Sequence, residues 1–170
     1  MNVFVLVAGP PGSGKSTLAR PLAEHLSLPL IAKDPIKEAM MDAMGWPASV
    51  HESRALGRAA VMALLEVASS SGGAVLDSTF FPYALPRITA LPGPLIEVRC
   101  CCPKAVAQAR YRARSGTRHR GHLDLERQPD ELWDDQGSRT LGIAPVIVVD
   151  TNAPVDVADI AARVQQLIRV

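Results

Sequence analysis

The sequence predicts an α/β fold in which a five-stranded parallel sheet carries helices on both faces. Five short apolar runs are typical of buried strands, and they span residues 3–8, 28–32, 74–77, 94–102 and 145–150. Segments with helical spacing of apolar residues separate these runs. Strands that alternate with helices usually pair in parallel, and strands buried on both faces are continuously apolar. Ligands in such sheets bind beyond the carboxyl ends of the strands.

The helices are predicted from the spacing of their apolar residues and from their end signals. The second helix has Asp34 as a suitable N-cap and Pro35 at its first position. Residues 80–91 are expected to form a loop with a short helix. One further helix runs from Pro103 into an arginine-rich stretch. The other predicted helices span about 17–26, 50–69, 131–141 and 157–168, and the second one, from Pro35, ends near Gly45.

The segment after the first strand reads Gly-Pro-Pro-Gly-Ser-Gly-Lys-Ser-Thr, from Gly9 to Thr17. It fits G-x-x-x-x-G-K-[ST], the phosphate-binding P-loop, and it lies between a strand and a helix as this motif requires. Glycines allow positive φ and close backbone approach, so that consecutive N–H groups point at phosphate oxygens. The residues expected to bind nucleotide here are Gly9, Gly12, Ser13, Gly14, Lys15, Ser16 and Thr17.

Two of these side chains have specific expected roles. Lys15 should reach the β- and γ-phosphates, as a catalytic cation, and the Ser16 hydroxyl should bind Mg²⁺. Asp77 follows the third strand, and a carboxylate there is expected to hold a Mg²⁺-bound water or the acceptor, with Thr79 assisting. The alternative for Asp77 is ordinary turn chemistry, because Asp-Ser-Thr readily bonds its own backbone.

Asp34 follows the second strand and is the candidate general base. A kinase that phosphorylates a hydroxyl gains from a carboxylate that accepts the hydroxyl proton and aims the oxygen at the γ-phosphate. The alternative is that Asp34 only caps the next helix. Lys37, one turn later, is a candidate for binding an anionic group of the acceptor, and its alternative is a solvated helix lysine.

The arginine-rich stretch around residues 110–128 is expected to form a lid over the nucleotide. One of its arginines would stabilise charge on the transferring phosphoryl group, with Arg114 and Arg118 as first choices and Arg110 as a nucleotide-binding residue. The alternatives are a solvated basic helix face and a nucleic-acid groove. Tyr111 is the one aromatic residue there, which makes base stacking a weak case. His119 and His122 have no third ligand at an obvious place, so no metal site is predicted there.

Composition limits the function classes further. The 170 residues fit one domain and carry a net charge of +1, so no global electrostatic attraction to nucleic acid is expected. We expect no membrane span and no signal peptide, which favours a cytoplasmic location. The three adjacent cysteines, Cys100 to Cys102, are interpreted as small strand residues rather than as metal ligands or a disulfide framework.

The chain resembles P-loop kinases related to adenylate kinases, especially the small predicted kinases of the AAA-33 type, a group that includes chloramphenicol phosphotransferase, zeta toxins and the kinase module of phage polynucleotide kinase. The P-loop carries this resemblance, together with Lys-Asp-x-Ile-Lys-Glu at 33–38, Leu-Asp-Ser-Thr-Phe at 76–80 and the arginines. The resemblance implies a three-layer P-loop NTPase fold with strand order 2-3-1-4-5, a helical lid, and Asp34, Asp77 and Arg114 or Arg118 at the active site. Lys37 stands where the polynucleotide kinase module has an arginine that binds the acceptor phosphate.

The leading hypothesis is therefore a kinase that transfers the γ-phosphate of ATP or GTP, with Mg²⁺, to a hydroxyl of a small molecule such as an antibiotic, a nucleoside or a sugar. One alternative is a 5′-hydroxyl polynucleotide kinase, which would bind single strands in a salt-sensitive way. Lysine at position 37 loses the bidentate geometry of arginine, so a nucleic-acid acceptor is not favoured. The other alternative is a nucleotide-hydrolysing switch, which needs a residue that positions water.

Overall fold

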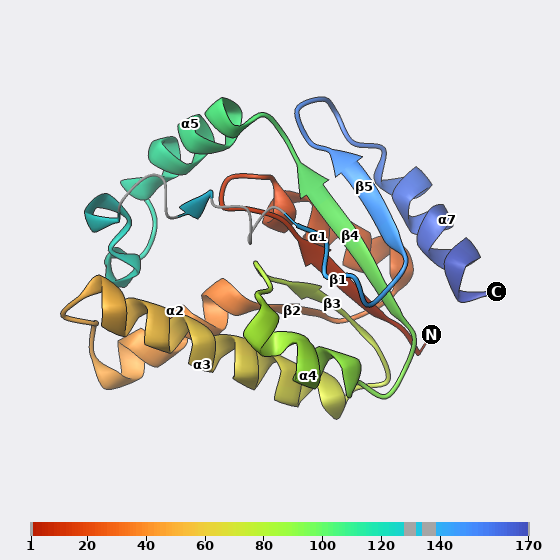
Figure 1. The fold of residues 1–170 in the computed structure, drawn as a ribbon, viewed down its shortest axis with the longest axis horizontal. Helices are drawn as coiled ribbons and strands as arrows, with labels where there is room; N and C mark the ends of the chain where they lie inside the picture. The colour runs from red at the N-terminus through yellow and green to blue at the C-terminus, as the bar shows by residue number, and fades with distance from the viewer. Residues whose placement is uncertain (1, 128–131, 134–138, 170) are drawn as a thin grey trace.

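A five-stranded sheet forms the centre of the computed structural model, which describes residues 2–127, 132–133 and 139–169 (Figure 1). All four pairings between neighbouring strands are parallel. The strand order β2-β3-β1-β4-β5 confirms the prediction. The strands are β1 (Phe4–Ala8), β2 (Leu30–Ala32), β3 (Ala74–Asp77), β4 (Leu95–Cys101) and β5 (Val146–Asp150).

Helices cover both faces of this sheet, and β1 shows how the sequence divides between them. Val3, Val5 and Val7 point to the face covered by α1 (Lys15–Leu26) and α7 (Val157–Ile168). Alternate residues, such as Phe4 and Leu6, point to the face covered by α3 (Val50–Ser69) and α4 (Leu85–Thr89). Because both faces are buried, every residue of β1 is apolar.

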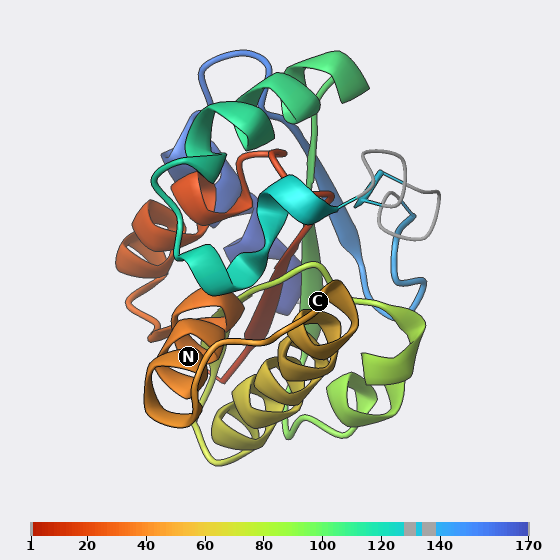
Figure 2. The same cartoon turned by 90° about the vertical axis from the view of Figure 1, so that its left-hand side faces the viewer.

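The remaining elements lie at the carboxyl edge of the sheet or connect to it. Figure 2 shows α5 on the side of the sheet opposite α2 and α3, with the chain after α5 crossing back towards them. The crossing chain is anchored there, because Ser53 of α3 donates a hydrogen bond to the carbonyl of Gly121 at 3.1 Å. These elements are α2 (Lys33–Met44), η1 (Pro82–Ala84), α5 (Lys104–Ser115), η2 (Arg120–His122) and η3 (Asp124–Glu126).

Two differences from the predicted elements concern the site. The second helix begins at Lys33, with Ala32 as its N-cap, so Asp34 lies inside the first turn and its side chain caps nothing. The interpretation of Asp34 as an N-cap is therefore wrong, because β2 turns directly into α2 without a connecting residue. The helix predicted for 131–141 falls largely outside the described residues. No helix in the described part of the chain is long and apolar enough to cross a membrane.

Candidate active site

A cavity of about 860 Å³ opens at the carboxyl edge of the sheet, where β1, β2 and β3 end. Five parts of the chain line it: the P-loop, the start of α2, residues 53–61 of α3, the end of β3 with the segment after it, and residues of the later chain between Tyr111 and Leu132. Among the sequence-predicted residues, those that line the cavity are Gly12, Gly14, Lys15, Ser16, Thr17, Asp34, Lys37, Asp77, Thr79, Arg114 and Arg118.

The P-loop has the backbone that its glycines permit. Gly9, Gly12 and Gly14 have φ values of 145°, 77° and 83°, a region that other residues rarely adopt. A Cβ at Gly12 would overlap the carbonyl oxygen of Ala107 in α5, and Thr151 packs against Gly14. The Ser13 hydroxyl is buried and has no hydrogen-bond partner in the described part of the chain. The loop is thus fixed from two sides, and it offers an unused polar atom.

Lys15 and Ser16 face the end of β3 from the start of α1. The Lys15 ammonium donates to the carbonyl of Pro10 at 2.9 Å. Burial lowers the pKa of Lys15 to about 8, although Asp77 and Asp34 oppose this shift. Burial also raises the pKa of the Asp77 carboxyl, and a hydrogen bond from the Ser16 hydroxyl opposes that change. A hydroxyl and a carboxylate therefore lie together beside the lysine.

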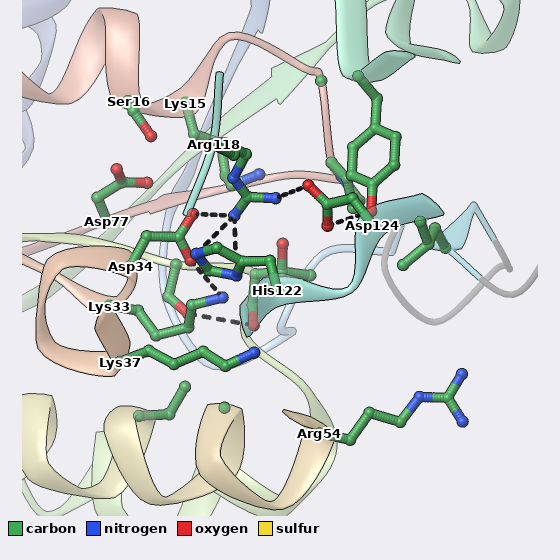
Figure 3. Close-up of a pocket in the computed structure, with 18 of the residues that line it drawn as sticks. Lys15, Ser16, Lys33, Asp34, Lys37, Arg54, Asp77, Arg118, His122 and Asp124 are labelled. Atoms are coloured by element: carbon green, nitrogen blue, oxygen red, sulfur yellow. Dashed lines mark hydrogen bonds and ion pairs between the residues drawn. The ribbon is translucent and has the colours of Figure 1, made fainter. Parts of the chain in front are cut away.

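Asp34 lies between two cations. Its two carboxylate oxygens are 2.6 Å from the Lys33 ammonium and 2.6 Å from the Arg118 guanidinium (Figure 3). Burial disfavours the charged carboxylate, but Lys33 and Arg118 outweigh burial and hold the pKa of Asp34 well below its usual range. Asp34 is consequently ionised at neutral pH and can accept a hydrogen bond from an alcohol.

Arg118 joins the chain after α5 to the other side of the cavity. Besides Asp34, it binds Asp124 at 2.7 Å, and Asp124 accepts a hydrogen bond from Tyr111 at 2.6 Å. Arg118 also donates to Nδ1 of His122 at 3.3 Å. Burial and the Arg118 charge lower the pKa of His122 to about 4, so the ring is neutral at pH 7 and its Nε2–H donates to Glu38 at 2.8 Å.

The other two predicted arginines differ in position. Arg114 lines the cavity, its guanidinium lies 5.6 Å from the centre of the Tyr111 ring, and its buried Nε has no hydrogen-bond partner in the described residues. Arg110 does not line the cavity. It donates to the carbonyl of Thr151 at 3.0 Å, on the loop after β5.

Lys37 is buried rather than solvated, so the interpretation of it as an exposed helix lysine is wrong. Only 2% of its surface is exposed, and its ammonium donates to Ser53 at 2.7 Å. Burial lowers the pKa of Lys37 to about 8, with the charges of Lys33 and Arg127 adding to this shift and Asp34 opposing it.

The Thr79 hydroxyl, after β3, donates a hydrogen bond to the carbonyl of Gly9 at 2.9 Å, which ties the end of β3 to the P-loop.

With this geometry established, comparison with known proteins identifies the family. Residues 4–139 match the family model AAA_33, described as an AAA domain. The chain belongs to the AAA_33 family. Among curated proteins, none matches it. The P-loop, the strand order and the family together make this AAA_33 chain a kinase-like P-loop NTPase.

Solved structures agree with this assignment. A candidate kinase from Chloroflexus aurantiacus J-10-fl is 30% identical, and the match covers 97% of each chain with a TM-score of 0.83. A gluconokinase from Sinorhizobium meliloti 1021 is 22% identical over 99% of this chain and 94% of its own, with a TM-score of 0.63. A shikimate kinase from Acinetobacter baumannii, solved with shikimate, is 18% identical over 99% and 92%, with a TM-score of 0.58. The last two comparisons show that the gluconokinase and the shikimate kinase share the fold of this chain.

The AAA_33 chain also has cavity residues that our sequence analysis missed. On α3, Ser53, Arg54, Gly57 and Arg58 line the cavity, and after β3 Phe81 and Tyr83 do so. A signal for the α3 residues was present, because two arginines four apart flank a glycine inside a predicted helix. Phe81 and Tyr83 gave no such signal, since single aromatic residues in a loop are common.

Ser16 and Asp77 fit the Mg²⁺ ion that P-loop kinases usually require. Mg²⁺ prefers hard oxygen ligands and is commonly held by one or two protein groups, with phosphates and water completing the octahedron. The adjacent hydroxyl and carboxylate match that pattern. His119 and His122 are bonded to Asp42 at 3.0 Å and to Glu38 at 2.8 Å, and the described residues contain no cluster of three or more His, Cys, Asp or Glu that could hold a metal ion.

Proposed function

We propose that the protein is a kinase that transfers the γ-phosphate of ATP or GTP to a hydroxyl of a small molecule. The observation that carries the proposal is that Asp34, an ionised carboxylate, lines the same cavity as the P-loop and Lys15. A switch that only hydrolyses nucleotide has no need for the large additional space between α2, α3 and the chain after β3. The names of the structural neighbours, a gluconokinase and a shikimate kinase, support a small-molecule acceptor.

In this proposal the nucleotide phosphates bind at the P-loop. The backbone N–H groups of the loop and Lys15 contact the phosphates, and Ser16 and Asp77 would hold Mg²⁺, Asp77 through water. A bound Mg²⁺ would offset the negative charge of the phosphate oxygens. The unpartnered Nε of Arg114 supports a phosphate contact for this side chain, because a buried N–H group without a partner is costly.

The acceptor hydroxyl donates its hydrogen bond to Asp34, which aims the oxygen at the γ-phosphorus. The new bond joins the acceptor oxygen to the γ-phosphorus, and the bond from the γ-phosphorus to the β–γ bridging oxygen breaks, releasing the nucleoside diphosphate. The proton of the hydroxyl passes to Asp34. Arg118 lies between Asp34 and Asp124 and supplies positive charge beside the reacting oxygen.

The chain from residue 110 to about 128 is proposed as the lid of a single domain that spans residues 1–170. Arg118 and His122 connect it to α2, through Asp34 and Glu38. Closing such a segment excludes water from the reacting groups, which limits wasteful hydrolysis. Arg110 is proposed to contact the nucleotide from the outer side of α5.

The proposal is tested by transfer of label from γ-labelled ATP and GTP, with Mg²⁺, to hydroxylated small molecules and to 5′-hydroxyl oligonucleotides. We expect label in a small molecule. Asp34→Asn should lower that transfer by about 10²- to 10⁴-fold while nucleotide affinity changes little, because the amide cannot take the proton. Asp159→Asn is the control, since Asp159 is exposed on α7 and does not line the cavity. Full transfer by Asp34→Asn would contradict the assigned base.

A further inference from the structure

The charged groups around the cavity are distributed unevenly. Among the described residues, eight lysines and arginines line it against three carboxylates. The carboxylates are engaged near the P-loop: Asp77 with Ser16, and Asp34 and Asp124 with Arg118. The wall formed by α3 contributes Arg54 and Arg58 and no acidic side chain. Among the described residues, the part of the cavity farther from the P-loop therefore carries more positive than negative side chains.

Arg58 is the residue of that wall whose charge is left without a partner. Its side chain is exposed and makes no hydrogen bond and no ion pair within residues 2–127, 132–133 and 139–169, and it lies close enough to Tyr83 for its charge to oppose the raised pKa of that phenol. Beside this wall, the buried Lys37 ammonium of α2 has Ser53 of α3 as its hydrogen-bond partner and no carboxylate within ion-pair distance in the described part. A buried cation such as Lys37 is stabilised by an anion, and the exposed Arg58 guanidinium at the edge of the cavity is available to bind one.

Gly57 separates Arg54 from Arg58 and lines the cavity from inside a 20-residue helix. Glycine destabilises a helix interior relative to alanine. Neither sterics nor φ explains it here, because a Cβ at Gly57 would meet no atom within 4 Å and φ is not positive. A ligand that lies directly on the helix backbone would explain the glycine, because any side chain at this position would occupy the same space.

One side of this region is apolar. The rings of Phe81 and Tyr83 are 6.2 Å apart and nearly parallel, at 18°, and both line the cavity, as does Val61 of α3. Tyr83 is 41% exposed, so its ring has area left to cover. This side fits the hydrocarbon body of a small molecule and offers no further charge.

We propose that the acceptor is an anionic alcohol, a hydroxylated carboxylic acid or phosphate monoester, whose anionic group binds Arg58 while its body lies on Gly57 and its hydroxyl faces Asp34. The proposal rests on the kinase function proposed above, and it narrows the substrate class. Arg58 and Gly57 are then determinants of acceptor specificity, whereas Asp34 acts on the hydroxyl.

A binding experiment tests the anion site without any phosphoryl transfer. With Mg²⁺ and a non-hydrolysable ATP analogue filling the P-loop, Tm is measured during titration with inorganic phosphate or acetate, against chloride at equal ionic strength. We expect phosphate or acetate to raise the Tm of the wild type and of Arg87→Gln, an exposed control on α4, but not that of Arg58→Gln. The anion that raises the Tm more shows whether the site prefers a phosphate or a carboxylate. Equal stabilisation of Arg58→Gln, or none of the wild type, would overturn the site.

A transfer experiment then separates this inference from the kinase function. Label from γ-labelled nucleotide is offered to matched pairs, a hydroxy acid with its amide and a sugar phosphate with its sugar. We expect kcat/KM for the anionic member to exceed that of the neutral member by about tenfold or more, the usual effect of one charged hydrogen bond. Equal use of the neutral members would overturn the anionic acceptor and leave the kinase intact. Nucleotide hydrolysis without any labelled acceptor would overturn the kinase function instead.

Gly57→Ala gives a readout that a purely structural glycine would not give. The added methyl group favours the helix, so Tm should rise by about 2–4 °C. The same methyl group should raise KM for the anionic acceptor severalfold, with kcat changed less, because it occupies the surface on which the acceptor lies. A variant that is more stable and has an unchanged KM would remove Gly57 from the acceptor site.

Discussion

Asp34, Lys15 and Lys37 show, at the scale of single residues, how burial and neighbouring charges set the protonation of the site. Asp34 remains ionised because Lys33 and Arg118 each lie 2.6 Å from one of its oxygens. Lys15 and Lys37 have lowered pKa values near 8 because burial disfavours their charge more than the carboxylates favour it. A bound anion would favour the charged form of both lysines.

The stability of the protein should therefore depend on pH through Lys37. In the unfolded chain a lysine keeps its proton up to a pH of about 10.4, whereas folded Lys37 loses it near 8. Between these values the unfolded chain binds more protons, so the free energy of unfolding rises with pH. Lys37→Met and Lys37→Arg do not titrate in this range, and both should lose part of the rise. Thermal unfolding between pH 7 and 10 measures this, and curves parallel to the wild type would contradict the lowered pKa.

At the scale of elements, α5 and the P-loop fix each other. The glycine spacing was interpreted as a requirement of the phosphates, but at Gly12 the nearest obstacle to a side chain is the Ala107 carbonyl of α5. The same helix carries Arg114 towards the cavity and continues into the segment that holds Arg118. A displacement of α5 would therefore move the arginines as well as the loop.

Gly12→Ala should be far more damaging than another glycine substitution at positive φ. Gly142 has a φ of 71° and open space around its Cβ position, so Gly142→Ala should cost about 1–2 kcal/mol from backbone strain alone. Gly12→Ala adds the clash with α5, for a total of about 2–5 kcal/mol. Denaturant unfolding and nucleotide titration of both variants test this. Equal losses would mean that α5 does not press on the loop.

The whole molecule encloses its cavity with segments that are far apart in the chain. The P-loop precedes residue 18, α3 lies between 50 and 69, and the arginines follow residue 110. Figure 1 shows these segments on three sides of the same edge of the sheet. A ligand that contacts all of these segments binds the folded chain but not the unfolded chain, so binding must stabilise the fold.

Nucleotide with Mg²⁺ should raise the stability by about 2.7 kcal/mol at a concentration 100 times its Kd, which corresponds to a Tm about 5–10 °C higher. Removing Mg²⁺ with a chelator should reduce this increase, because Ser16 and Asp77 would then have no ion to bind. Lys15→Met should remove most of the increase. Thermal unfolding with ATP and with GTP measures the effect, and stabilisation of Lys15→Met equal to that of the wild type would contradict nucleotide binding at the P-loop.

Local sequence determined most of the fold. Continuous apolar runs such as residues 3–8 and 145–150 must be buried on both faces, and the helical patterns between them leave a parallel sheet as the solution. The P-loop was determined in the same way, because a phosphate-binding backbone needs glycines at particular positions, and the positive φ values confirm it. The strand order was implied by the family resemblance, and pairing of the strands confirms it.

Tertiary structure decided which side chains share the cavity. The sequence offered Asp34 as a helix cap or a base, and Lys37 as solvated or functional, because the backbone around each allowed both. The surroundings of each residue depended on partners distant in the chain: Arg118 is 84 residues from Asp34, and Ser53 of another helix bonds to Lys37. The contribution of α3, with Gly57 and Arg58, likewise emerged only when that helix lay beside the P-loop edge. Sequence patterns report local periodicity and motifs, whereas charges act on whatever the fold brings within a few ångströms.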